Sequence, residues 1–168
     1  HDSQIYDLEN KIAVGFPQEI QRCKELVVNL TADAATVQAH THKDAEGKDI
    51  FSMQLMEKTY TEKEPAGKAL LGLLGVALDT EKPVPIGNYK GLALQVSHAV
   101  FGNVFSVKLV GAGTYTAELG NDVLGNLTRI SNLANGIEPN IEKIKAKQAR
   151  LEQQLASAEE EVKRPFPQ

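Results

Sequence analysis

Residues 123–162 read VLGNLTRISNLANGIEPNIEKIKAKQARLEQQLASAEEEV, and the spacing of their apolar side chains decides the fold class. An apolar or small residue returns at alternating intervals of 4 and 3, which is the heptad pattern of helices that pair along a seam. Gln148 is a polar member of this seam, and such residues can set the register of a coiled coil. The seam consists of Val123, Leu127, Ile130, Ala134, Ile137, Ile141, Ile144, Gln148, Leu151, Leu155, Ala158 and Val162.

A second heptad seam near the N-terminus predicts the partner helix. It begins at Ile20 and keeps the same intervals to Val37. Just before it, Phe16 shifts the stripe, and Gly15 and Pro17 lie at that point. We therefore expect a break or kink there, with Pro17 in the first turn of the following helix. The apolar positions on the two sides are Ile5, Leu8 and Ile12, then Ile20, Cys23, Val27, Leu30, Ala34 and Val37.

The C-terminal helix carries its own start, interruption and end signals. An Asn or Asp at 121–122 can cap its start. Gly136 and Pro139 interrupt the helix, and Pro165 and Pro167 mark its end. Pro17 lies 22 residues before residue 39, and Pro139 lies 18 residues after residue 121. We therefore expect the two helices to bend at a similar distance from the middle region.

The two helical segments enclose a middle region of different periodicity. We predict an α+β fold in which 1–39 and 121–168 form a long antiparallel coiled-coil arm, and 40–120 forms a small head domain with an antiparallel sheet and one helix. A capping box of Thr61 and Glu64 is expected to start that helix. The predicted elements of the head are a polar loop at 40–49, strands at 51–55, 89–99, 104–110 and 114–119, a helix at 66–78, a rigid loop at 83–85, and turns at 102–103 and 111–113.

Composition excludes several classes of protein. The net charge of -4 and the pI of about 5.6 argue against a surface that is basic throughout. Cys23 is the single cysteine, so a disulfide framework and a cysteine-rich zinc site are excluded, and its seam position favours core packing. No apolar run reaches the length of a membrane span. Gly67, Gly72 and Gly75 fall inside a helix pattern, and Gly111 and Gly113 lie between strands, which disfavours a phosphate-binding loop.

A cluster of His40, His42 and Asp44 has donor groups that suit a transition metal. The spacing is loose and the cluster lies in a polar loop, so we interpret it as solvated. His98 could complete a site only if the tertiary fold brought it near. A metal-dependent enzyme built on this cluster is the least favoured hypothesis.

Basic residues gather on the C-terminal helix. Between residues 140 and 150 only Glu142 opposes them, and the local net charge is +3. A solvated coiled-coil flank is the simpler interpretation, and a contact with DNA phosphates is the alternative. The sheet adds further polar candidates at Gln95, His98, Thr114 and Thr116. The candidate DNA contacts are Lys143, Lys145, Lys147 and Arg150 on the helix, with Lys90 and Lys108 on the sheet.

Several short motifs resemble those of one protein family. They are IYDL at 5–8 with NKI at 10–12, FPQEI at 16–20, FSM at 51–53, YTEK at 60–63 with AG at 66–67, PVPIG at 83–87 with YKG at 89–91, LGNDV at 119–123, GNLTRI at 125–130 and RPFPQ at 164–168. Together they resemble the C-terminal region of very large proteins of conjugative and other mobile elements, which join a Swi/Snf-type helicase to an adenine-specific DNA methyltransferase-like region. The family's ATP-binding, helicase and methyltransferase signatures have no counterpart here, so the resemblance transfers no catalytic residue.

The resemblance implies a non-catalytic accessory module of a DNA helicase/methyltransferase that positions or contacts DNA or another domain. The alternative is a protein–protein interaction or oligomerisation module without a DNA role. We expect a cytoplasmic monomer that uses no cofactor, contacts no membrane and binds DNA or other domains of the parent. Its abrupt ends at His1 and Gln168 are expected of an excised fragment.

Overall fold

The computed structural model describes residues 2–163, which form two compact units. The first unit combines the chain up to Val28 with the chain from Pro139, and the second runs continuously from Asn29 to Glu138. The second unit therefore includes the end of helix α2 (Phe16–Ala39) and all of helix α4 (Val123–Asn135), whereas the sequence division at 39 and 121 assigned both to the arm.

The predicted interruption of the N-terminal helix is confirmed and takes the form of a π-helical turn. Helix α1 (Asp2–Asn10) leads into η1 (Lys11–Gly15), and α2 follows without a gap. The amide of Phe16 donates to the carbonyl of Lys11, five residues earlier, as in a π-helix. Pro17 is the second residue of α2, in the first turn, where its missing N–H breaks no helical hydrogen bond.

The first unit is held by the seam between α2 and α5 (Ile137–Lys163). Ile20, Cys23 and Leu151 are buried together, and Phe16, Ile144 and Leu155 pack around them. All eight seam positions of α5 are at least partly buried, while the intervening residues of α5 are exposed. The heptad prediction is therefore confirmed for this helix.

The prediction that both helices bend at a similar distance from the middle region is wrong. Phe16 and Ile20 belong to the cluster that contains Leu151 and Leu155, so Pro17 lies beside that part of α5. Pro139 lies 12 residues before Leu151 along the same helix, about 18 Å away at 1.5 Å per residue.

The C-terminal helix is interrupted as predicted. Helix α4 ends at Asn135, Gly136 stands outside the helix, and α5 starts at Ile137 with Pro139 in its first turn. Asp122 occupies the N-cap position of α4 but makes no side-chain capping hydrogen bond. Pro165 and Pro167, predicted to end the helix, lie outside the described residues.

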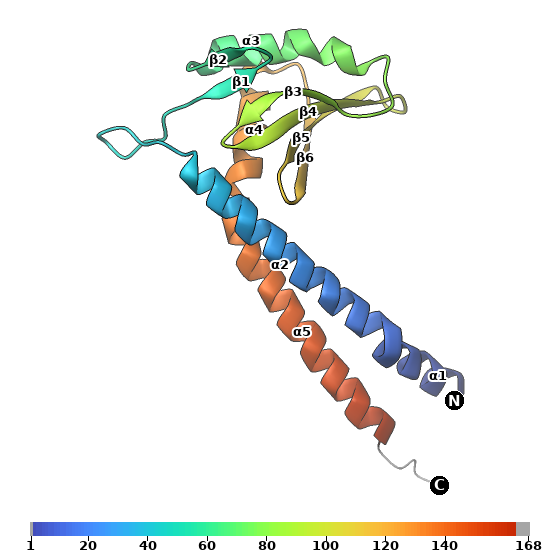
Figure 1. Ribbon diagram of the computed structural model, residues 1–168. Coiled ribbons are helices and arrows are strands. Elements are labelled where there is room, and N and C mark those ends of the chain that lie inside the picture. Colours follow the sequence, from blue (N-terminus) through green and yellow to red (C-terminus); the bar gives the residue numbers. More distant parts are fainter. Residues whose placement is uncertain (1, 164–168) are drawn as a thin grey trace. The chain divides into compact units, whose positions relative to one another are not determined.

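The second unit contains a six-stranded antiparallel sheet in the order β2-β1-β3-β4-β5-β6 (Figure 1). Strands β5 and β6 and the short β1 agree with the sequence prediction. The single strand predicted at 89–99 is wrong, because a tight turn at Lys90-Gly91 divides it and the strand before the turn includes Pro85. Strand β2 was not predicted. The strands are β1 (Met53–Leu55), β2 (Lys58–Tyr60), β3 (Val84–Tyr89), β4 (Leu92–Ala99), β5 (Val104–Val110) and β6 (Thr114–Leu119).

One face of the sheet carries the core and the other is open. Leu94 lies opposite Leu109 and Val96 opposite Val107, and all four side chains are fully buried. Helix α3 (Lys63–Leu73), its 3-10 extension η2 (Leu74–Ala77) and α4 contact strands on this covered face, so two helices flank it rather than the one predicted. The capping box of Thr61 and Glu64 is not formed, because Glu62 is the N-cap residue and makes no side-chain capping bond.

A buried carboxylate ties the end of α2 to the turn between β5 and β6. Asp33 is 2% exposed and accepts hydrogen bonds from the amides of Ala112 (2.7 Å) and Gly113 (2.8 Å). The Tyr115 hydroxyl donates to the same carboxylate at 2.6 Å. Burial, followed by the hydrogen bond and the negative charge of Asp33, raises the pKa of Tyr115 well above its ordinary value.

Candidate functional site

The basic residues of α5 divide between two faces of the helix. Lys143, Lys147 and Arg150 are spaced by 4 and 3, so they lie on one face, which we call the basic face. All three side chains are exposed because the seam that buries α5 runs along a different stripe. Within the part of the chain that the structure describes, no ion pair engages any of the three.

Lys145 does not belong to the basic face. It pairs with Glu142 three residues earlier, with 3.8 Å between Nζ and the carboxylate, and both side chains are largely exposed. An exposed pair of this kind is weak, but it lowers the local positive charge. The structure therefore separates the four helical candidates into three unpaired cations and one paired cation.

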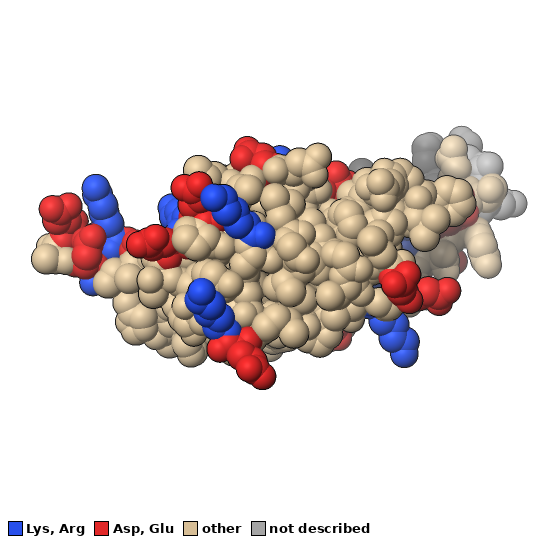
Figure 2. Space-filling view, turned by 90° about the horizontal axis from the view of Figure 1, so that it is seen from above, with Lys and Arg blue, Asp and Glu red and all other residues tan. Residues whose placement is uncertain are grey.

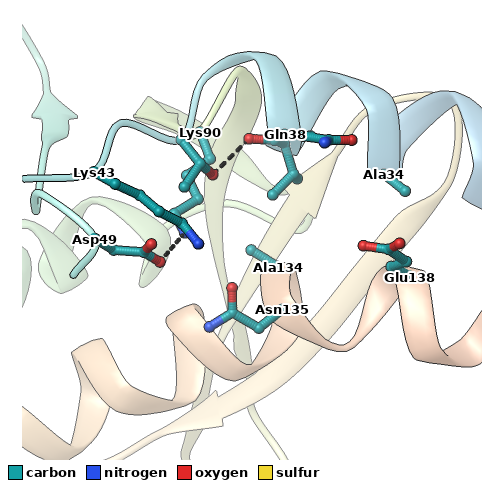
Figure 3. Close-up of a pocket in the computed structure, with 10 residues that line it drawn as sticks. Ala34, Gln38, Lys43, Asp49, Lys90, Ala134, Asn135 and Glu138 are labelled. Carbon is teal, nitrogen blue, oxygen red and sulfur yellow. Dashed lines mark hydrogen bonds and ion pairs between the residues drawn. The ribbon is translucent and has the colours of Figure 1, made fainter. Parts of the chain in front are cut away.

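Lys90 is not available on the surface as predicted. Its side chain is 9% exposed, its Nζ lies 3.2 Å from the Asp49 carboxylate, and the ammonium group lies 5.7 Å from the centre of the Tyr89 ring. This residue has a positive φ of 49° in the turn between β3 and β4, and its side chain lies among the residues that line the cavity of Figure 3. A phosphate would have to displace Asp49 to reach it.

Lys90 forms part of the wall of a cavity of about 500 Å³ in the second unit (Figure 3). The end of α2, the loop that follows it and the end of α4 supply the other walls. Four charged side chains line the cavity and their formal charges cancel, so it has no preference for a strongly anionic ligand. These residues are Lys43, Asp49, Lys90 and Glu138.

Lys108 lies in the middle of the open face of the sheet. Gln95 and Thr116 stand opposite it on the neighbouring strands, and its side chain is partly exposed. Glu118 is exposed on the same face, one pleat further along β6. Figure 2, a view from above, likewise shows acidic side chains next to basic ones around a wide uncharged area. Lys108 therefore has no lysine or arginine opposite it on either neighbouring strand.

Two of the three candidate metal residues, His40 and Asp44, hydrogen-bond to nearby backbone groups, and His42 is exposed in the loop. The ring Nδ1 of His40 lies 2.8 Å from the carbonyl of Thr36 in the last turn of α2. Asp44 accepts hydrogen bonds from the amides of Glu46 and Lys48 and so closes its own loop. Within residues 2–163 no group of three or more His, Cys, Asp or Glu side chains is placed to hold a metal ion.

No protein-family model, curated protein or solved structure matches this chain. No helix in the described range is both long and apolar enough to span a bilayer.

Two other sequence candidates have clear structural roles. Cys23 is 2% exposed in the seam between α2 and α5, as predicted for a core residue. The His98 ring lies 2.7 Å from the amide oxygen of Asn103 and packs against the tilted Phe105 ring with 4.7 Å between the ring centres, so it braces the hairpin between β4 and β5.

The tip of that hairpin carries the main surface feature that the sequence analysis missed. Val100 is 83% exposed and Phe101 is 96% exposed. Because Phe101 precedes the predicted turn at 102–103, the alternation of strand residues gave no signal for its position.

Proposed function

We propose that this chain is a non-catalytic accessory module that contacts nucleic-acid phosphates through the basic face of α5. The observation that carries the proposal is that Lys143, Lys147 and Arg150 are exposed, lie on one helix face and have no ion-pair partner among the described residues. A cation without a carboxylate partner is free to neutralise a phosphate, whereas Lys145 and Lys90 already have carboxylate partners.

The dimensions of the basic face also support the proposal. Lys143 and Arg150 are seven residues apart, which is about 10 Å along a helix. A DNA strand advances roughly 3.4 Å along the duplex axis per phosphate, so the face covers the rise of about three phosphates. The seam keeps α5 straight in this region because bending would unpack it, so the three cations stay aligned.

The resemblance of the sequence motifs supports the wider assignment. On this proposal the module belongs to a large mobile-element protein that combines a Swi/Snf-type helicase with an adenine-specific DNA methyltransferase-like region. Such a parent would act on DNA in the cytoplasm, with this module positioning DNA or another domain and the catalytic steps taking place elsewhere in the parent.

Titration of duplex DNA against salt concentration tests the phosphate contact. With three phosphates neutralised, log affinity should fall with log salt at a slope of about −2.7. Replacing Lys143, Lys147 and Arg150 together by Gln should remove most of the affinity at low salt and flatten the slope. The matched comparison is between two single variants, Lys147→Gln on the basic face and Lys145→Gln off it, because each removes one charge from the same helix and only the first should weaken binding.

The second candidate function is a protein-interaction module without a DNA role. The exposed Val100 and Phe101 favour it, because two adjacent apolar side chains at a hairpin tip offer a contact point for a protein partner. The same titration distinguishes the two. No binding even at low salt, or an equal loss with Lys145→Gln, would reject the basic face and favour this alternative.

A further inference from the structure

Strand β6 forms one edge of the sheet (Figure 1). Its six residues pair with β5 in an unbroken register from Thr114 to Leu119. No strand of the described chain pairs with its other side. An edge of this length presents a row of backbone groups that can accept a further strand.

The turn between β3 and β4 identifies which backbone groups of β6 point outward. Tyr89 and Leu92 close a two-residue hairpin and so exchange hydrogen bonds with each other. Successive residues of a strand direct their backbone N–H and C=O groups toward opposite neighbouring strands. Leu92 bonds with Tyr89 in β3, so Ala93 bonds with Val110 in β5. The backbone groups of Val110 then point toward β4, and Val110 does not bond with Thr114 in β6. The free N–H and C=O groups therefore belong to Thr114, Thr116 and Glu118.

The opposite edge of the sheet is protected. Strand β2 has only three residues and includes Lys58. Short length and lysine are common means by which proteins block edge-to-edge pairing. A helix contacts each edge strand, α3 on β2 and α4 on β6, so helix contact does not distinguish the two edges. Strand β6 has no lysine, no proline and no irregularity in its register, and its one charged residue is Glu118.

The side chains of β6 suit an antiparallel copy of the same strand. We propose that two copies of this chain pair through β6, with Thr116 opposite Thr116 of the second copy. In this register all three residues with free backbone groups meet another such residue, and Thr114 lies opposite Glu118. The Thr116 pair is favourable, the Thr114 hydroxyl can donate to the Glu118 carboxylate, and no like charges face each other. Tyr115 lies opposite Ala117 on the other face.

This pairing uses backbone groups of the second unit and no residue of the basic face, so it is independent of the proposed function. The contact is small compared with a stable dimer interface, so the dimer should form only at high protein concentration. A dimer would depart from the monomer expected from the sequence, and it would form without pairing the helical seams between chains.

Sedimentation velocity over a wide concentration range tests the proposal, together with hydrogen exchange. We expect a reversible monomer–dimer equilibrium. We also expect amide exchange at Thr114, Thr116 and Glu118 to slow roughly tenfold on going from dilute to concentrated protein. Thr116→Pro should abolish both effects, because it removes an outward N–H and leaves the bonds to β5. Thr116→Val keeps the N–H and should retain the dimer.

Any of three results would overturn the proposal. The first is a dimer that persists in Thr116→Pro, because the contact would then lie elsewhere. The second is amide exchange at the three wild-type residues that does not depend on protein concentration. This measurement needs no variant, so it decides the question even if Thr116→Pro folds poorly. The third is a wild-type chain that stays monomeric at every concentration, which would leave the β6 edge to an extended segment of a different protein.

Discussion

Tyr115 donates a hydrogen bond of 2.6 Å to Asp33, a residue 82 positions earlier in the chain. This bond joins the last turns of α2 to the β5–β6 hairpin. Because Asp33 also accepts two backbone amides, one carboxylate fixes a helix, a turn and a strand within the second unit.

Replacing this carboxylate should destabilise the second unit. Asp33→Ala leaves two amides and a hydroxyl without their acceptor, and we expect a loss of about 2 to 4 kcal/mol in the free energy of unfolding. Urea denaturation measures the change. Asp79→Ala, at an exposed position in a loop, is the control and should stay within about 0.5 kcal/mol of wild type. Equal stability of Asp33→Ala and wild type would mean that the hydrogen bonds contribute nothing.

The raised pKa of Tyr115 predicts a specific loss of stability in alkali. In the unfolded chain Tyr115 ionises near pH 10, but in the folded chain burial and Asp33 keep it protonated to higher pH. Its contribution to stability is therefore complete below pH 10 and is lost as the pH rises toward the folded pKa. The measurement compares wild type with Tyr115→Phe across this range, because other tyrosines and lysines titrate equally in both. Parallel stability curves for the two proteins would contradict the shift.

A charge placed in the covered face of α4 should be severely destabilising. Ile130 is fully buried, and Ile130→Asp would leave a carboxylate without a partner in the core. We expect a loss of several kcal/mol, on the order of 4, in thermal or urea unfolding. Thr128→Asp, on the exposed side of the same helix, is the matched control and should have little effect. If both variants melt alike, Ile130 is not in the core.

Gly87 lies in β3 where the backbone of β1 comes close to it. A Cβ at this position would overlap the carbonyl of Gln54, which is part of the backbone and cannot rotate away. Gly87→Ala should therefore cost about 2 to 4 kcal/mol and speed amide exchange in β1. Gly72→Ala is the opposite control, because its Cβ would meet no atom within 4 Å, and alanine favours a helix by about 1 kcal/mol. Similar effects of the two substitutions would contradict the close approach.

The helices could be predicted from the sequence because their signal is local. The intervals of 4 and 3 depend only on neighbouring residues, and every predicted seam residue of α5 is at least partly buried. The turn at 102–103 was also predicted, since Gly102 and Asn103 both adopt positive φ there, of 84° and 50°. Strand β3 was missed because Pro85 and the irregular register between Pro85 and Gly87 break the alternation that marks a strand.

The candidate site was predictable only in part. Spacing alone places Lys143, Lys147 and Arg150 on one face, but it does not show that Lys145 pairs with Glu142. Neither could the burial of Lys90 be predicted, because its partner Asp49 lies 41 residues away. Asp33 gave no signal for the same reason. A polar residue beside a heptad seam normally faces water, and only the tertiary fold brings Ala112 and Tyr115 to it.

The pairing of α2 with α5 within one chain is tested most directly by methyl nuclear Overhauser effects between Ile20 and Leu151. The spectrum is recorded on dilute protein carrying Thr116→Pro, so that strand pairing between copies does not contribute. The packing of these two side chains predicts a cross-peak, and isotope-filtered spectra of mixed labelled and unlabelled chains should assign it to contacts within one molecule. A cross-peak that arises only between molecules, or none at all, would contradict the paired helices on which the basic face depends.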